Sequence, residues 1–342
     1  MTKSLLTTES QTAIRKFQHS LGRWFRKHGR DLPWRETRDP YAVLVSEVML
    51  QQTQVATVLP YYARWMQQFP SFATLAAADE HEVLQLWQGL GYYSRAKNLH
   101  RTAQCVIQEH GGRFPHDLAA IRKLPGLGRY TAGAVATFAL GQAVPVIDAN
   151  IARVLARLFD IREPIDTTAG TARLWDRATG LVPAKEPRIY NSALMELGAL
   201  VCLPRKPACA VCPVRIHCAA EKPEMLPVKK PRRKTIDLSE RCAFVMRDGE
   251  FLLEKQTGKR WHGLWKLPQV RGAESGVRSE KLLYEAVYPF THHRVTLLVY
   301  PGRPPRNLME NQRWFSNPDD APMTTPHRRA VLALLARDSI GF

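Results

Sequence analysis

Residues 124–133 read LPGLGRYTAG, a proline–glycine turn that runs into a helical segment. Gly126 and Gly128 allow the backbone to turn sharply and present N–H groups at a helix N-terminus, where a phosphate group can bind. Such turns are common, so this one is a weak signal by itself. The stretch Val146–Val154 (VIDANIARV) follows, and Asp148 stands where a residue would cap the next helix. Together the two stretches predict helices arranged around a phosphate-binding turn.

The chain around this turn has the pattern of a helical domain. Apolar residues recur three and four positions apart, and proline or glycine separates the segments. The clearest segments are Tyr41–Leu59, His81–Trp87, Ala96–Glu109 and Ile151–Phe159. We therefore expect mainly α structure from about residue 11 to about residue 221.

The composition changes at Lys222. Residues 222–234 carry six basic side chains, one acidic side chain and three prolines, which predicts a solvated linker that either only connects or also binds phosphate or a partner. Beyond it, an Asp-Gly pair predicts a hairpin between two short strands. The predicted strands and the closing helix are Cys242–Arg247, Glu250–Glu254, Arg294–Tyr300 and Pro326–Arg337. The second domain is therefore expected to be mixed α/β.

The charge balance indicates the class of partner. The 342 residues include 49 Lys and Arg against 31 Asp and Glu, a formal net charge of +18, which favours nucleic acid first and a membrane surface second. The longest uncharged run, Tyr130–Ile147, contains glycine, threonine and proline and is too polar for a membrane span. The N-terminus lacks the apolar core of a signal peptide, so we expect a protein of the reduced cytoplasm.

Four of the six cysteines lie close together, with the spacing C-x6-C-x2-C-x5-C. Four neighbouring thiolates in a reducing compartment are more typical of a metal site than of disulfides, and six cysteines are too few for a disulfide scaffold. Zinc and an iron–sulfur cluster both fit four sulfur ligands, although zinc ribbons usually contain two C-x2-C pairs and this stretch contains one. The candidate ligands are Cys202, Cys209, Cys212 and Cys218; Cys105 and Cys242 lie far away and are expected to be ordinary buried residues.

Two carboxylates stand in contrasting surroundings. Glu47 has apolar neighbours on both sides, and burial there would raise its pKa and make it a proton donor near neutral pH. Asp148 could be only a helix cap, but a carboxylate that accepts backbone N–H groups also stays ionised. Two such carboxyl groups suit the cleavage of a glycosidic bond, where the leaving group takes a proton and the sugar becomes cationic. In a basic protein, an N-glycosidic bond of DNA fits better than a polysaccharide.

These features resemble those of one superfamily of DNA repair enzymes. The cysteine spacing on a helical domain, with the hairpin and Asp148, is similar to that of the endonuclease III superfamily of helix–hairpin–helix DNA glycosylases. The resemblance implies a mainly α glycosylase domain over residues 1–221, with a six-helix barrel at about 31–139 and a cluster domain at about 1–30 and 140–221. It also implies one 4Fe–4S cluster with a structural or redox-modulating role.

Three further motifs narrow the resemblance to one family. The segments Ser46–Val55 (SEVMLQQTQV), Leu32–Arg35 (LPWR) and Gly89–Tyr93 (GLGYY) are similar to segments of the MutY family of adenine DNA glycosylases. The family's activity is implied: a monofunctional enzyme of base excision repair that excises undamaged adenine mispaired with 8-oxoguanine or G. It would flip the base out and hydrolyse the N-glycosidic bond with acid assistance.

The second domain resembles the family's Nudix-like domain through Gly263–Pro268 (GLWKLP). This implies a basic linker at 222–236 and an α/β 8-oxoguanine recognition domain at 237–342. A hydrolytic Nudix domain needs a glutamate-rich helix with an Arg-Glu core to hold Mg²⁺. The glutamates that follow lack this core, so no pyrophosphatase activity is expected; they are Glu274, Glu280 and Glu285.

The resemblance assigns roles to the residues around the two carboxylates. Glu47 would protonate adenine and then help to activate water, and Asp148 would stabilise the cationic sugar. Tyr130 would orient these groups; bifunctional relatives carry a Schiff-base lysine at this position, so weak or no AP lyase activity is expected. Arg35 and Ser192 would line the adenine pocket. Ser192 stands where the family usually has Gln or Glu, so contact there would run through water.

Other residues are implied to contact DNA. Gln52 and Tyr92, with Leu90 close by, would insert into the duplex and offset the cost of flipping adenine, although ordinary core packing is the other interpretation of Tyr92. The family's Phe-Ser-His loop, which senses 8-oxoguanine, is here Phe-Thr-His. Its sensing residues would be Thr291 and His292, with His293 as the alternative ring, and the phosphate contacts would be Gly126, Gly128, Arg205 and Lys206. We expect a nucleoid-associated monomer that binds double-stranded DNA with A:8-oxoguanine or A:G mispairs, and whose linker could bind repair partners.

Three other functions remain open at this point. A bifunctional pyrimidine glycosylase/lyase is disfavoured by Tyr130 and the extra domain. A non-catalytic mismatch-binding protein is disfavoured by the presence of both Glu47 and Asp148. An iron–sulfur electron-transfer protein is disfavoured by the positive charge and the hairpin.

Overall fold

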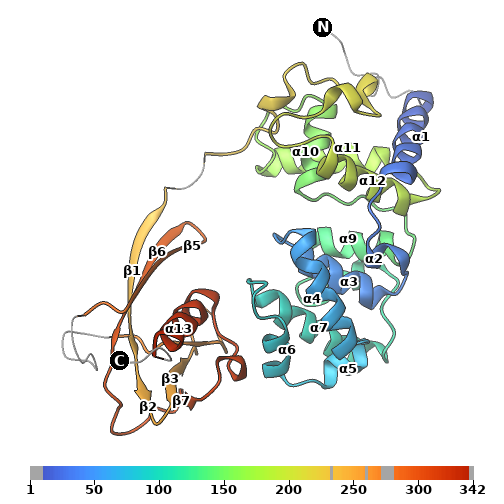
Figure 1. The fold of residues 1–342 in the computed structure, drawn as a ribbon. Helices are drawn as coiled ribbons and strands as arrows, with labels where there is room; N and C mark the ends of the chain where they lie inside the picture. The colour runs from blue at the N-terminus through green and yellow to red at the C-terminus, as the bar shows by residue number, and fades with distance from the viewer. Residues whose placement is uncertain (1–10, 232–233, 259–260, 271–280, 339–342) are drawn as a thin grey trace. The chain divides into compact units, whose positions relative to one another are not determined.

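The computed structural model describes residues 11–231, 234–258, 261–270 and 281–338 (Figure 1). Its contacts divide the chain into two compact units. Unit 1 contains the residues up to Gln54, together with Met66–Ala76 and Arg101–Pro231. Unit 2 contains Val55–Trp65, Ala77–His100 and the described residues beyond Arg233. A helical N-terminal region and a C-terminal region with mixed sheets are both present, so the predicted fold class is confirmed.

Unit 1 contains helices and short helical turns. The α-helices that lie wholly within it are α1 (Gln11–His28), α2 (Pro33–Glu36), α3 (Pro40–Leu50), α8 (Leu118–Ile121), α9 (Arg129–Phe138), α10 (Ala149–Leu158), α11 (Thr168–Leu181) and α12 (Pro187–Leu200). The 3-10 turns are η1 (Cys209–Val211), η2 (Arg215–His217) and η3 (Pro223–Met225). Two further helices, α5 (Phe72–Ala77) and α7 (Ser94–His110), cross the boundary between the units, as does α4 (Val55–Gln68).

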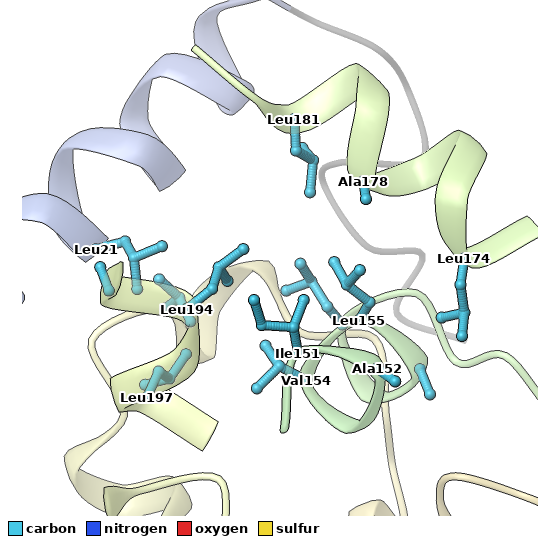
Figure 2. Packing of buried hydrophobic residues seen from close by; sticks show 14 of the residues in the cluster. Leu21, Ile151, Ala152, Val154, Leu155, Leu174, Ala178, Leu181, Leu194 and Leu197 are labelled. Carbon is cyan, nitrogen blue, oxygen red and sulfur yellow. The ribbon is translucent and has the colours of Figure 1, made fainter. Parts of the chain in front are cut away.

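One core of unit 1 lies between α1, α10, α11 and α12 (Figures 1 and 2). Ile151, Val154 and Leu155 recur three and four positions apart on α10, so they share one face and are all buried. Figure 2 shows them facing Leu194 on α12 and the residues of α11. This packing fixes the direction of α10, whose N-terminus carries Asp148.

Helix α3 differs from the prediction in its length. The expected helix over Tyr41–Leu59 ends at Leu50, and α4 begins at Val55. Between them Gln52 has φ +60°, a left-handed conformation that stops an α-helix. The apolar pattern continues across this break, which is why periodicity alone did not reveal it.

Unit 2 combines α6 (Glu80–Leu86) and parts of α4 and α7 with the C-terminal sheets. One sheet has the order β1-β6-β5, with β1 parallel to β6 and β5 antiparallel to it. The other contains β2, β3 and β4, and β7 pairs with β3. The strands are β1 (Ile236–Phe244), β2 (Met246–Arg247), β3 (Glu250–Lys255), β4 (Trp265–Lys266), β5 (Tyr284–Phe290), β6 (His293–Pro301) and β7 (Gln312–Phe315), followed by α13 (Thr325–Asp338).

The Asp-Gly hairpin is confirmed between β2 and β3. Asp248 has φ +52° and Gly249 has φ +79°, the two positive angles that a type I′ turn requires. Strand β5 was missed by the sequence analysis. It contains Pro289 and alternates between half-buried and exposed residues, a weak pattern that an edge strand tolerates.

The predicted linker over 222–236 differs from the structure at both ends. Leu226 is buried, the carbonyl of Val228 accepts the N–H of Ile165, and Lys230 N–H donates to Asp166, so the segment through Pro231 belongs to unit 1. At the other end β1 already begins at Ile236. The burial of Leu226 and these two hydrogen bonds hold the first part of this basic stretch within unit 1. Arg232 and Arg233, like Glu274 and Glu280 in the second domain, lie outside the described residues.

Across the parts of the chain that the structure covers, no helix is both long enough and apolar enough to cross a bilayer.

Candidate active site

Glu47 lies within a buried helix. Every side chain from Tyr41 to Met49 on α3 is buried, and Glu47 is 4% exposed. Burial raises the pKa of Glu47 to about 7, while its hydrogen bond with Tyr130 acts in the opposite direction. The burial and raised pKa predicted from its apolar neighbours are thus confirmed. A carboxyl group with this pKa can donate or accept a proton near neutral pH.

Tyr130 holds the carboxyl group of Glu47. Its hydroxyl donates to Oε2 of Glu47 over 2.6 Å, from the first turn of α9, the helix that follows the glycine turn. Burial, together with the charges of Glu47 and Asp148, raises the pKa of Tyr130 well above its usual value, so the phenol stays protonated and remains a donor. A second link between the helices runs from Gln51 Nε2 to Thr131 Oγ1 over 3.2 Å. The hairpin and α3 therefore build one site.

Asp148 is the N-cap of α10. Its Oδ1 accepts the N–H of Ile151 over 2.6 Å, and its Oδ2 accepts Asn150 Nδ2 over 3.0 Å. Burial raises the pKa of Asp148, and these hydrogen bonds only partly offset that effect. The predicted cap is confirmed, but the net direction of the pKa is upward, opposite to what capping alone predicts. The charge of Asp148 also raises the pKa of Glu47, so the two carboxyl groups lie close enough to interact.

Two residues that the sequence analysis missed keep Asp148 in place. Asn191 on α12 accepts the N–H of Val146 over 3.3 Å and donates to the carbonyl of Val144 over 3.1 Å, which fixes the segment leading to Asp148. Gly198 provides the second restraint, because a Cβ there would lie 2.7 Å from Cβ of Asn150. The close approach of α10 and α12 thus requires glycine at 198.

Arg35, predicted in the adenine pocket, forms a buried ion pair. Its Nη2 lies 2.7 Å from Oε2 of Glu196, a fully buried side chain that also binds Arg30. Arg35 is close enough to Glu47 to lower its pKa. Ser192, also buried, lies one helical turn before Glu196 on α12. Glu196 was missed, although an acidic residue beside Leu194 and Leu197 is the same signal that singled out Glu47.

The four clustered cysteines line one pocket. Apolar side chains of α10 and α12 complete its wall. Arg157 on α10 is 1% exposed and donates to Sγ of Cys202 over 3.2 Å and to the carbonyl of Leu203 over 2.7 Å. Cys202, Cys209, Cys212 and Cys218 are thereby brought together as predicted. Hydrogen bonds to sulfur from a buried arginine suit a negatively charged thiolate cluster.

The donor set fits a metal site, because four cysteine sulfurs line one pocket and a buried arginine donates to one of them. Four sulfur ligands suit zinc as well as an iron–sulfur cluster. Of the other cysteines, Cys242 is buried as predicted, whereas Cys105 is only half-buried.

Several predicted DNA-contacting residues are exposed, and three of them have unusual backbone angles. Gln52, Tyr92 and Thr291 have φ of +60°, +48° and +54°, which is rare for residues other than glycine. Tyr92 is 58% exposed. Leu90 is 6% exposed, which does not fit the insertion predicted for it. Arg95 donates to the carbonyls of both Leu90 and Gly91, so its guanidinium group holds this loop through the loop's backbone carbonyl groups.

The phosphate-contact candidates lie on two loops of unit 1. Gly126 and Gly128 are exposed, and Gly128 occupies the N-cap of α9 without a side chain to satisfy the N–H groups that follow. Arg205 and Lys206 are exposed on the loop that Arg157 holds. Both sites leave donors available to a phosphate group.

Comparison with known proteins identifies the family. Residues 45–177 match the family described as HhH-GPD superfamily base excision DNA repair protein. The adenine DNA glycosylase of Buchnera aphidicola subsp. Acyrthosiphon pisum is 33% identical over 259 residues, which cover 74% of this chain and 74% of that protein. The chain belongs to the adenine DNA glycosylase family. The matched range of the superfamily contains Glu47, Tyr130 and Asp148.

Other adenine DNA glycosylases are similar over a smaller part of their length. The human adenine DNA glycosylase is 48% identical over 218 residues, which are 61% of this chain but only 40% of the human protein. This chain therefore spans less than half of its mammalian relatives. Among solved structures, a thermostable thymine-DNA glycosylase is 31% identical with a TM-score of 0.56, and covers 61% of this chain and 96% of its own. The adenine DNA glycosylase family thus shares its helical fold with a glycosylase of another base.

Proposed function

We propose that this protein excises adenine from DNA by acid-assisted hydrolysis of the N-glycosidic bond, in base excision repair. The observation that carries the proposal is the buried carboxyl group of Glu47, with a pKa of about 7, beside a second carboxyl group at Asp148. A protonated carboxyl group can give its proton to the departing base. A second, ionised carboxyl group can stabilise the cationic sugar that remains. The family membership supports adenine as the base.

In the proposed reaction Glu47 is protonated before the bond breaks. Its proton passes to the adenine ring as the bond to the sugar lengthens, and the resulting carboxylate then accepts a proton from the attacking water. The hydroxyl of Tyr130 holds Oε2, which leaves the other carboxyl oxygen to face the base. Asp148 supports the positive charge of the sugar, and its cap hydrogen bonds to Ile151 and Asn150 keep its orientation fixed.

Tyr130 makes the proposed enzyme monofunctional. A lysine at this position would offer an amine that forms a Schiff base with the sugar, whereas a phenol of raised pKa offers neither an amine nor an anion. Weak or no strand cleavage is therefore expected.

We further propose that Cys202, Cys209, Cys212 and Cys218 hold one 4Fe–4S cluster. When bound, such a cluster cross-links its loop and provides a one-electron redox centre. Arg157 binds Cys202 and the carbonyls of Leu203 and Pro204, so it connects the cysteines to the loop that carries Arg205 and Lys206. The role proposed for this region is to present these two cations to the DNA backbone.

The proposed substrate is double-stranded DNA in which adenine is mispaired with 8-oxoguanine or G. The net charge of +18 favours binding to the phosphate backbone, at the N-terminus of α9 and at the cluster loop. Gln52 and Tyr92 would insert into the duplex, since both are exposed and held in a left-handed conformation. Thr291 and His292 would contact 8-oxoguanine. Arg35 and Ser192 would contact adenine, with water completing the reach of the serine.

Single-turnover base release tests this proposal. Matched duplexes carrying A opposite 8-oxoguanine, G or T are each incubated with excess enzyme, with and without alkali to reveal abasic sites. We expect fast release from the first, slower release from the second and none from the third, with strand breaks mainly after alkali. A protein that binds these duplexes but releases no adenine would be a mismatch-binding protein. Trapping by borohydride would instead indicate a lyase.

A further inference from the structure

The β5–β6 turn is held in a strained conformation. Phe290 pairs with His293, so Thr291 and His292 form the two-residue tip of the hairpin. Thr291 is exposed and has φ +54°, a conformation that β-branched residues rarely adopt. Its hydroxyl donates to the carbonyl of Phe290 over 2.7 Å. The intrinsic preference of threonine does not favour this turn, so contacts from elsewhere must hold it.

Trp261 packs behind this turn. Its ring centroid lies 5.6 Å from that of Phe290 in an edge-on arrangement and 6.1 Å from that of Tyr288. Tyr288 and Phe290 are two residues apart on β5 and therefore face the same side of the sheet. The indole also contacts His327 on α13, with 5.8 Å between centroids. Trp261 thus touches the last two inward-facing residues before the tip and the helix behind them.

The backbone of Trp261 is itself strained. Its φ is +58°, which is uncommon for a large side chain. The segment is closed at its base by two hydrogen bonds, from Gly263 N–H to the carbonyl of Gln256 over 2.7 Å and from Gln256 N–H to the carbonyl of Leu264 over 2.8 Å. Strain at a residue persists where the surrounding structure fixes it, and such residues concentrate at binding sites.

A buried charge cluster forms the base of this arrangement. Glu240 on β1 accepts Lys266 Nζ over 3.0 Å and the hydroxyl of Tyr288 over 2.7 Å. The Nε2 atom of His327 lies 3.7 Å from Oε2 of Glu240. Glu240, Cys242 and His327 have the composition of a cation site, but the ammonium group of Lys266 already supplies the positive charge there. Two of the three rings around Trp261 are therefore anchored to a buried, hydrogen-bonded carboxylate.

We infer that Trp261 is a positioning residue for recognition of the base opposite adenine. By packing on Phe290 and Tyr288, it fixes the turn so that Thr291 and His292 face that base in one conformation. The inference rests on the proposed function and adds a residue outside the motifs that suggested the recognition loop. A loop that is fixed before binding loses less conformational entropy when it binds, so its ligand binds more tightly. The increase in affinity applies only to a base that the loop contacts.

The test compares Trp261→Ala and Trp261→Phe with a matched control, Trp314→Phe. Trp314 belongs to the same region, where it stacks with Arg247. Single-turnover release from A:8-oxoguanine and A:G duplexes gives a rate ratio, and fluorescence anisotropy on 8-oxoguanine and G duplexes gives an affinity ratio. We expect Trp261→Ala to lower both ratios about tenfold, the scale of one or two aromatic contacts, with the A:G rate unchanged. Trp261→Phe keeps an aromatic ring at this position, so it should retain most of both ratios. Trp314→Phe should keep the ratios of the unmodified protein.

The outcomes separate the two proposals. If the unmodified protein releases no adenine, the proposed function fails, while the affinity ratio still tests Trp261. If Trp261→Ala keeps both ratios, or loses A:G and A:8-oxoguanine activity equally, Trp261 is not a positioning residue for recognition. Thermal unfolding of each variant shows whether the domain remains folded at the assay temperature. If Trp261→Ala is unfolded there, Trp261→Leu, which fills more of the space but has no aromatic ring, replaces it and must lower both ratios.

Discussion

Glu47 and Glu240 are both buried glutamates, yet their environments give them opposite properties. Glu47 is 4% exposed and Glu240 is 7% exposed, and burial raises the pKa of each. At Glu240, hydrogen bonds and charges from His327, Lys266 and Tyr288 more than offset the burial, so its pKa is lowered overall. At Glu47 the main opposing contact is the neutral hydroxyl of Tyr130, and the pKa rises to about 7. The charge of the partner, rather than burial, separates a carboxyl group with a raised pKa from one with a lowered pKa.

Glu196 supports the same distinction within unit 1. It is fully buried, as Glu47 nearly is, but it pairs with Arg30 and Arg35 and its pKa is lowered. Arg35 thus satisfies Glu196 through a direct hydrogen bond and acts on Glu47 only through its charge. A direct ion pair between Arg35 and Glu47 would favour the ionised form of Glu47 and remove the proton that the proposed reaction needs.

The largest expected effect is on catalysis at Glu47. Glu47→Gln removes the transferable proton but keeps the size of the side chain, so single-turnover adenine release should fall by roughly 10²–10⁴-fold, the usual contribution of general acid catalysis. DNA affinity, measured by anisotropy, should be retained. Glu82→Gln, an exposed position on α6, is the matched control and should react at the normal rate. Near-normal turnover by Glu47→Gln would show that another group supplies the proton.

The next effect is on stability, and its sign should differ between the two glutamates. The pKa of Glu47 rises from 4.5 to about 7 on folding, so the folded protein holds this proton more tightly and loses stability as pH rises from about 4.5 to about 7. The loss amounts to about 3 kcal/mol for a shift of this size. Glu47→Gln should therefore be more stable than the unmodified protein at pH 8 and lose that advantage at pH 4.5. Urea unfolding at the two pH values measures this difference.

Glu240→Gln is the opposing control in the same experiment. Its folded pKa is lowered, so Glu240 contributes stability above pH 4.5 that disappears as the pH falls through the lower folded value. Glu240→Gln should thus be less stable than the unmodified protein at pH 8, because Lys266 is left buried without its counter-charge. Destabilisation of both variants at pH 8 would mean that Glu47 is ionised and paired. The proposed contrast between the raised pKa of Glu47 and the lowered pKa of Glu240 would then be wrong.

The sequence was sufficient for the local parts of the site. The apolar neighbours of Glu47 predicted its burial, and the position of Asp148 before an amphipathic stretch predicted its cap. The spacing of the cysteines predicted that they meet. The first two inferences depend on residues within one or two turns of a helix, where helix geometry fixes which side chains are neighbours. The third depends on four cysteines that lie within seventeen residues of one another.

Long-range pairings could not be predicted in the same way. Arg35 and Glu196 are separated by most of unit 1, and nothing in either segment specifies the other. The burial of Leu90 depends on how its loop turns, which Arg95 determines through carbonyl contacts. Apolar residues follow Trp261 three and four positions later, yet nothing in the sequence predicts its positive φ or its packing on the β5–β6 turn. Tertiary contacts override local preference at all three positions.

The smallest expected effect tests how Tyr130 sets the pKa of Glu47. Its hydrogen bond stabilises the ionised carboxylate, so Tyr130→Phe should raise the pKa of Glu47 and move the alkaline limb of the pH–rate profile upward, by up to about one unit. At pH 8 the carboxyl group of Glu47 would then be protonated in a larger fraction of the enzyme, which raises the rate. The missing hydroxyl no longer orients this carboxyl group, which lowers the rate. A profile with an unchanged alkaline limb and a uniformly lower rate would assign Tyr130 to orientation alone. A downward shift would mean that Tyr130 favours the protonated acid, and the neutral-partner explanation for Glu47 would then be wrong.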